Sequence, residues 1–126
     1  MMSILDSLSS TSAKQSFYFV VFTKSMNGAD GFISEGIGQS AFNFITTKTD
    51  KFAGYFNSLP ELGTVDLNNW ADHILGEIQV SNENRVEKAV SELESLLTKN
   101  VNQSGEERKL IIEKLNRRIR TKAKSL

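Results

Sequence analysis

The sequence predicts an all-α protein, a compact array of four to six helices with an aromatic-rich N-terminal half and a C-terminal amphipathic helical hairpin. Two observations predict this fold class. From residue 64 onward, apolar residues recur at three- and four-residue steps. Of the 11 aromatic residues, ten lie between Phe17 and Phe56, and the last is Trp70. A chain of 126 residues without cysteine can bury a sufficient core without disulfides or a structural metal, so we expect one domain over 1–126.

The first element, over residues 12–28, has a helical and a strand interpretation. The run Phe17–Phe22 is apolar all round and rich in aromatic and β-branched residues, which also suits a strand. A capping-box pattern at Ser12–Gln15 and a helix stop at Asn27-Gly28 favour a helix of normal length. We therefore predict a buried central helix, followed by a glycine-containing loop over 27–36.

The second element is a predicted helix over residues 35–58 that ends before Pro60. Its apolar residues share one arc of a helical wheel, and Phe42 widens the arc, so we expect this helix to pack against two neighbours. Lys48 lies inside the arc. It is either a buried charge that serves a ligand or a side chain whose stem lies on the core while its ammonium reaches water. We favour the second interpretation.

Three further helices are predicted in the C-terminal half. The first covers about 67–79 and has Asp66 as its capping candidate, and the second covers about 83–100. The third follows an S-x-x-E capping box at Ser104–Glu107 and continues to about residue 124. The last two helices combine apolar stripes with dense charge of both signs, a pattern typical of a helical hairpin laid on a core or on a partner.

This hairpin is also the predicted partner-binding surface. Its stripes can be completed by a second chain or by the aromatic half of the same chain, and periodicity does not say which. The residues central to such an interface are Leu93, Leu96, Leu97, Leu115 and Ile119. Our leading hypothesis is accordingly a non-enzymatic protein-interaction module that self-associates or binds a protein partner.

A basic patch closes the chain. Residues 104–126 hold eight Lys and Arg against three Glu, and the candidate residues for phosphates or anionic lipid are Arg117, Arg118, Arg120, Lys122 and Lys124. The segment lacks aromatics for stacking on bases, and the whole chain has a formal net charge of zero. Nucleic-acid binding is therefore the less favoured alternative.

The sequence contains only weak matches to catalytic, metal-binding and cofactor-binding motifs. His73 and Glu77 are four residues apart and share a helical face, but no further metal-ligand pattern accompanies them. Gly36, Gly38 and Ala41 satisfy a loose G-x-G-x-x-A dinucleotide pattern without the strand that should precede it. We expect no enzymatic activity, no metal and no cofactor.

Two further expectations concern ligands and location. As an alternative function, the aromatic-rich half could enclose an apolar small molecule or acyl chain. The longest uncharged stretch, over 36–47, has 12 residues, well short of the roughly 20 apolar residues that span a bilayer. Because the N-terminal apolar run is too short for a signal-peptide core, we expect a soluble, cytoplasmic protein without a transmembrane segment.

Overall fold

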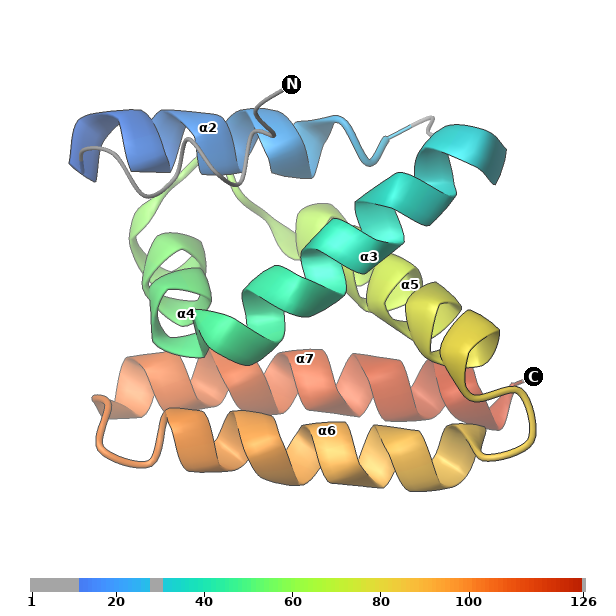
Figure 1. Cartoon of the computed structure of the whole chain (residues 1–126). Helices are drawn as coiled ribbons and strands as arrows, with labels where there is room; N and C mark the ends of the chain where they lie inside the picture. The colour runs from blue at the N-terminus through green and yellow to red at the C-terminus, as the bar shows by residue number, and fades with distance from the viewer. Residues whose placement is uncertain (1–11, 28–30, 126) are drawn as a thin grey trace.

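The computed structural model describes residues 12–27 and 31–125. The described residues form helices and no strand, so the predicted all-α class is confirmed, and the run Phe17–Phe22 is helical. The helices, labelled as in Figure 1, are α2 (Ser12–Lys24), α3 (Gly31–Thr47), α4 (Thr49–Ser58), α5 (Thr64–Ser81), α6 (Val86–Asn100) and α7 (Glu106–Lys124). None of these helices is both long and apolar enough to cross a bilayer.

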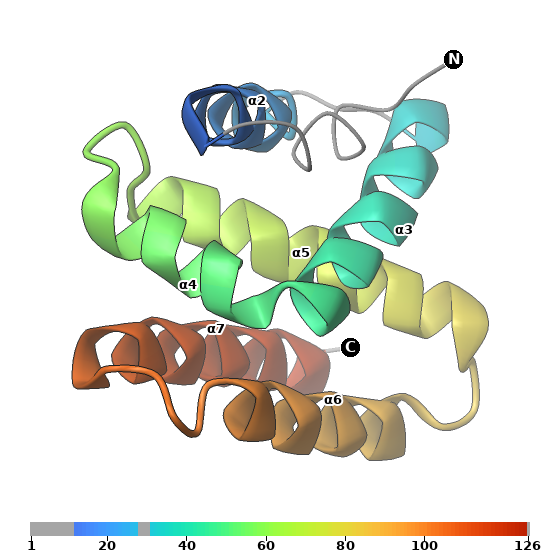
Figure 2. The same cartoon turned by 60° about the vertical axis from the view of Figure 1, so that its left-hand side comes forward.

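The helices are stacked in three levels. Helix α2 lies on one side, α3, α4 and α5 form the middle level, and α6 and α7 lie side by side on the far side (Figures 1 and 2). The chain turns back between α6 and α7, so the two helices are antiparallel, consistent with the predicted hairpin. Helix α7 contacts α4, α5 and α6. The hairpin is therefore laid against the rest of the same chain.

The interior of the N-terminal half is a cluster of aromatic rings. Phe19 and Trp70 are fully buried and stack with ring centroids 5.4 Å apart. The ring of Phe52 meets Trp70 edge-on at 4.8 Å, and Phe44 lies 5.4 Å from Phe19. Aromatic pairs in this distance range are attractive beyond the burial of their area. The cluster joins α2, α3, α4 and α5 into one core.

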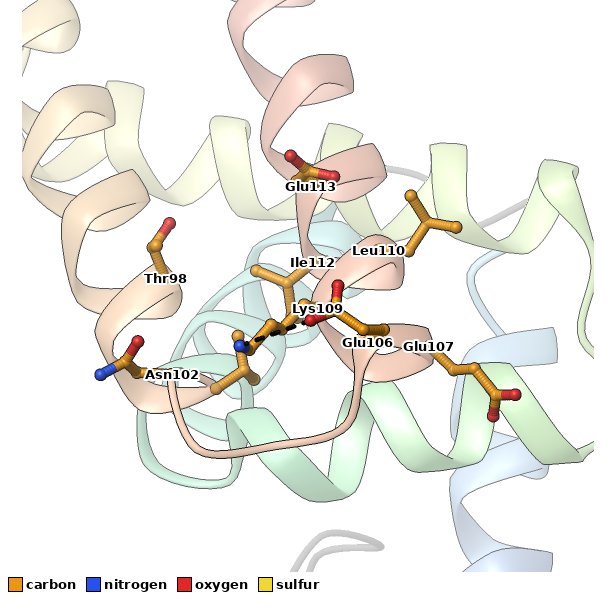
Figure 3. A pocket seen from close by; sticks show the side chains of 9 residues that line it. Thr98, Asn102, Glu106, Glu107, Lys109, Leu110, Ile112 and Glu113 are labelled. Carbon is orange, nitrogen blue, oxygen red and sulfur yellow. Dashed lines mark ion pairs between the residues drawn. The ribbon is translucent and has the colours of Figure 1, made fainter.

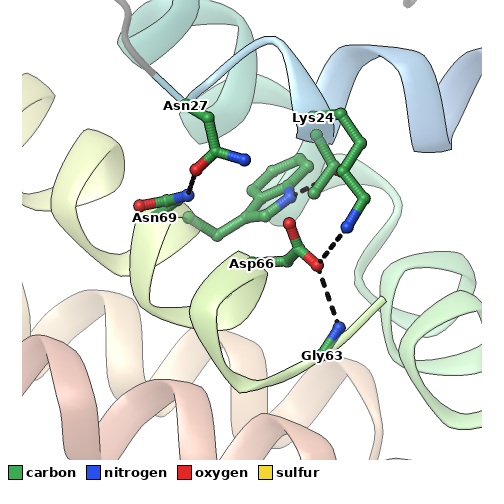
Figure 4. Close-up of polar contacts among 7 residues, drawn as sticks. Lys24, Asn27, Gly63, Asp66 and Asn69 are labelled. Atoms are coloured by element: carbon green, nitrogen blue, oxygen red, sulfur yellow. Dashed lines mark hydrogen bonds and ion pairs between the residues drawn. The ribbon is translucent and has the colours of Figure 1, made fainter. Parts of the chain in front are cut away.

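Polar contacts dock α2 on α5 (Figure 4). The Lys24 ammonium lies 2.8 Å from the Asp66 carboxylate, whose side chain is only 4% exposed. Deeper in the interface, the Trp70 indole N–H donates to the Thr23 hydroxyl at 2.9 Å. Since buried polar groups need hydrogen-bond partners, these contacts restrict how α2 can sit on α5.

The predicted helix over 35–58 is wrong in one respect, because the chain forms two helices, α3 and α4, that meet at Lys48. The segment around the break is rich in threonine. Thr46, Thr47 and Thr49 each donate a hydroxyl hydrogen bond to a backbone carbonyl of the preceding turn, an arrangement that bends helices. Lys48 itself leaves the helical region, with φ −130° and ψ 44°.

Helix starts and ends also differ from prediction. Helix α3 begins at Gly31, so part of the predicted loop is helical. Helix α2 ends at Lys24, where the Ser25 hydroxyl bonds the Phe22 carbonyl, and the predicted stop at Gly28 lies outside the described residues. Helix α5 begins at Thr64 after an N-cap at Gly63, and Asp66 accepts the Gly63 N–H at 2.9 Å. Asp66 therefore caps from inside the first turn instead of from the N-cap position.

The predicted capping box at Ser104–Glu107 is also wrong. The N-cap of α7 is Gly105, without a side-chain cap. The Ser104 hydroxyl instead bonds the Asp50 carboxylate of α4, which also pairs with Arg108. Ser104 thus bonds a residue of another helix instead of the backbone of α7, and this contact holds the start of α7 against α4.

The predicted helix over 83–100 starts later than expected, at Val86. It follows a turn in which the Arg85 N–H donates to the Asn82 carbonyl.

Helices α3 and α5 approach each other closely at Gly38. A Cβ at Gly38 would lie 3.0 Å from the backbone oxygen of His73, whereas a Cβ at Gly36 would have nothing within 4 Å. We expect Gly38→Val to lower the free energy of unfolding by about 1–3 kcal/mol, because a backbone oxygen in a helix cannot move aside. The matched Gly36→Val should change it by less than about 0.5 kcal/mol. Chemical denaturation measures both, and equal effects would contradict this packing.

Candidate functional site

The structure separates the five predicted partner-binding residues into two groups. Leu93, Leu97, Leu115 and Ile119 are at most 5% exposed and belong to the core of this chain. Leu96 is 39% exposed. The stripes of α6 and α7 are thus completed within the molecule at four positions, and Leu96 is the one position of the five that offers apolar surface to a partner.

Leu96 lines a groove of about 360 Å³ among α3, α5 and α6. Its apolar lining comes from all three helices, with Leu93 and Ile78 buried and Phe42 and Ala89 half-buried. The remaining lining residues are Thr46, Asn82 and Glu92.

The polar groups of this groove are largely satisfied within the chain. The Thr46 hydroxyl donates to the Phe42 carbonyl at 3.0 Å, and the Asn82 amide donates to the Ile78 carbonyl at 3.4 Å. Among the described residues, no buried side-chain nitrogen or oxygen lacks a hydrogen-bond partner. Small-molecule sites typically combine apolar walls with a few convergent polar groups, so this lining suits an apolar side chain better than a polar metabolite.

The predicted basic patch is partly neutralised by acids of the same chain. Arg120 pairs with Glu94 at 2.6 Å, and Lys122 pairs with Asp72 at 2.7 Å. The Arg118 guanidinium donates to the Asn68 amide oxygen at 2.6 Å, a neutral partner. Arg117 and Lys124 are exposed. Arg117, Arg118 and Lys122 line a shallow groove between α5 and α7, together with Asn68 and Thr121.

His73 and Glu77 lie together, as predicted, in a second groove between α3 and α5, of about 510 Å³. Asp72 also lines this groove, but its carboxylate is paired with Lys122, and Glu77 accepts a hydrogen bond from Ser81 at 3.2 Å. Within the described part of the chain, no three His, Cys, Asp or Glu side chains gather as metal ligands. This arrangement brings His73 next to carboxylates without assembling a metal site.

Two other sequence candidates lie in helical surroundings. Gly36, Gly38 and Ala41 are inside α3, so they do not form the strand-to-helix turn that binds a pyrophosphate. Lys48 is half-buried at the break between α3 and α4, and its ammonium lies 6.0 Å from the centroid of the Phe44 ring. That position matches the interpretation in which the lysine stem lies along the core.

The aromatic rings proposed to enclose an apolar ligand instead contact one another. Phe19 has five aromatic neighbours with ring centroids between 4.7 and 6.0 Å. Tyr55, the nearest of them, is half-buried, and burial raises the pKa of its phenol above the ordinary value. Ring packing of this kind is typical of a hydrophobic core.

A groove at the turn between α6 and α7 has three glutamates among polar and apolar lining residues (Figure 3). Glu106, Glu107 and Glu113 line it with Lys109, whose ammonium lies 3.8 Å from Glu106. Glu107 also accepts a hydrogen bond from the Asn57 amide at 2.9 Å. Leu110 adds a half-exposed apolar side chain. Exposed carboxylates with so few fixed contacts are typical of a solvated surface.

The site that the sequence predicted incompletely is therefore the groove beside Leu96. The sequence predicted Leu93 and Leu96 as partner-binding residues, placed Phe42 only in the aromatic half expected to enclose an apolar ligand, and indicated no binding role for Ile78 or Ala89. Phe42, Ile78 and Ala89 lie on three different helices. The sequence contained one indication of this groove, because Phe42 extends the apolar arc of its helix beyond what one neighbouring helix would cover.

Comparisons of the chain with models of protein families, with curated proteins and with solved structures found no match.

Proposed function

We propose that this protein is a non-enzymatic interaction module that binds a protein partner through the groove beside Leu96. The observation that carries the proposal is the exposed Leu96 side chain, which lines a groove together with Phe42 and Ala89. Apolar grooves between helices are a recurring way of receiving a helix or an apolar side chain of a partner. The formal net charge of zero means that no strong overall repulsion opposes association.

Photo-crosslinking tests the proposal in the cells that produce the protein. A photoreactive amino acid in place of Leu96 should give one discrete adduct, whose second component mass spectrometry identifies as a protein. The matched control replaces Val65, which is 64% exposed on α5 and does not line the groove. We expect no discrete adduct at position 65, because isolated exposed apolar residues are ordinary on protein surfaces.

A second variant connects the adduct with the groove. Ala89→Asp places a carboxylate in the groove wall at a half-buried position, and it should abolish the adduct at position 96 because a partner would have to bury that charge. Circular dichroism confirms that the variant is folded. Absence of an adduct at position 96, or equal adducts at positions 96 and 65, would contradict the proposed function.

A further inference from the structure

We infer that the partner of this groove is a second copy of the chain, docked so that the two α6 helices run antiparallel about a two-fold axis at Leu96. This inference rests on the proposed function, because it names the occupant of the same groove. It is carried by the charge pattern on the outer face of α6.

Two opposite charges flank Leu96 on that face. Glu92 precedes Leu96 by four residues and Lys99 follows it by three, and these spacings place all three side chains on one side of a helix. All three are exposed. The ion pairs found within the described residues include neither Glu92 nor Lys99, and Glu92 also lines the groove.

A two-fold axis at Leu96 makes these charges self-complementary. With a rise of about 1.5 Å per residue, Glu92 lies about 6 Å before Leu96 along the helix and Lys99 about 4.5 Å after it. An antiparallel second copy therefore brings its Lys99 opposite Glu92, with an axial offset of about 1.5 Å that both flexible side chains can bridge. Symmetry repeats the pair. A parallel arrangement would instead oppose Glu92 to Glu92.

The apolar part of the face suits the same arrangement. Leu96 of each copy would meet the other near the axis, at one end of the groove that the half-buried Ala89 and Phe42 also line. The neighbouring side of α6 packs against α7, where Glu94 of α6 forms an ion pair with Arg120 of α7. The contact would thus have an apolar centre and a charged rim, the usual composition of a protein interface.

Charge reversal tests the orientation of the two copies. In sedimentation equilibrium at low salt, Glu92→Lys or Lys99→Glu alone should weaken the dimer about tenfold or more, since each change turns two attractive pairs into repulsive ones. The double variant Glu92→Lys with Lys99→Glu should regain wild-type dimerisation. A mixture of the two single variants should form a one-to-one heterodimer, which native mass spectrometry detects.

Control variants separate local pairing from overall charge. Glu61→Lys and Lys114→Glu change net charge by the same amounts at exposed positions outside α6. Each should dimerise like the wild type, and their mixture should show no preference for the heterodimer. High salt should reduce every effect of the charge reversals, because exposed charges are screened.

The outcomes distinguish this inference from the proposed function. A purified chain that stays monomeric at millimolar concentration, while position 96 crosslinks to a different protein in cells, overturns the second-copy inference and leaves the proposed function standing. A monomer with no adduct at position 96 overturns both. A dimer that is insensitive to both charge reversals overturns the antiparallel arrangement.

Discussion

Replacing Trp70 with alanine is expected to lower the free energy of unfolding by about 3–5 kcal/mol, the range for removing a large buried aromatic side chain. Trp70 is 0% exposed and contacts the rings of Phe19, Phe22, Phe44 and Phe52. The substitution also removes the indole donor to the buried Thr23 hydroxyl. Since small domains are stable by only about 5–15 kcal/mol, much of the fold's stability depends on this residue.

Denaturant titration followed by far-ultraviolet circular dichroism measures this effect without relying on tryptophan fluorescence. Phe17→Ala is the matched control, because Phe17 lies on α2 but is 63% exposed. It should change the free energy of unfolding by less than about 0.5 kcal/mol. A loss below about 1 kcal/mol for Trp70→Ala would mean that the aromatic rings do not form the main core.

Ile119→Asp is expected to abolish cooperative folding, whereas Leu96→Asp should leave the chain folded. Ile119 is 1% exposed in α7, so its replacement buries a carboxylate without a partner, at a cost of several kcal/mol. Leu96 is 39% exposed, and an aspartate there can reach water. The two variants introduce the same aspartate at two residues of the predicted interface, one buried and one exposed.

Thermal unfolding monitored by circular dichroism distinguishes the two variants. We expect no cooperative transition for Ile119→Asp and a transition within a few degrees of the wild type for Leu96→Asp, which also should no longer associate. If Ile119→Asp instead remained a folded monomer, the hairpin stripe would belong to an interface and the packing of α7 described above would be wrong.

Sequence patterns predicted the structure correctly where they depend only on residues of the same helix. The apolar periodicity of 67–79 predicted α5 within three residues at its start and two at its end, because that pattern depends on neighbours along the chain. The predictions were wrong where a side chain of the pattern bonds a residue far away in the sequence instead of its neighbours. Ser104 matched a capping box, yet its hydroxyl bonds Asp50, which lies 54 residues earlier.

The candidate site illustrates the same division. Leu96 is recognisable from the sequence as part of a stripe, but its exposure depends on which faces α3 and α5 leave uncovered. Phe42, Ile78 and Ala89 are separated by 36 and 11 residues along the chain, and they meet in one groove. Their spacing in sequence contains no information about this proximity.

Helical periodicity and composition are local properties, so they were sufficient to predict the all-α class and the aromatic character of the N-terminal half. The six helices within residues 12–27 and 31–125 agree with the predicted four to six. Three features depend on the packed fold: the position of the break in the helix over 35–58, the acids that pair with Arg120 and Lys122, and the leucine that stays at the surface. The physical reason is that burial and ion pairing depend on neighbours brought together by packing, which a periodic pattern along one segment does not specify.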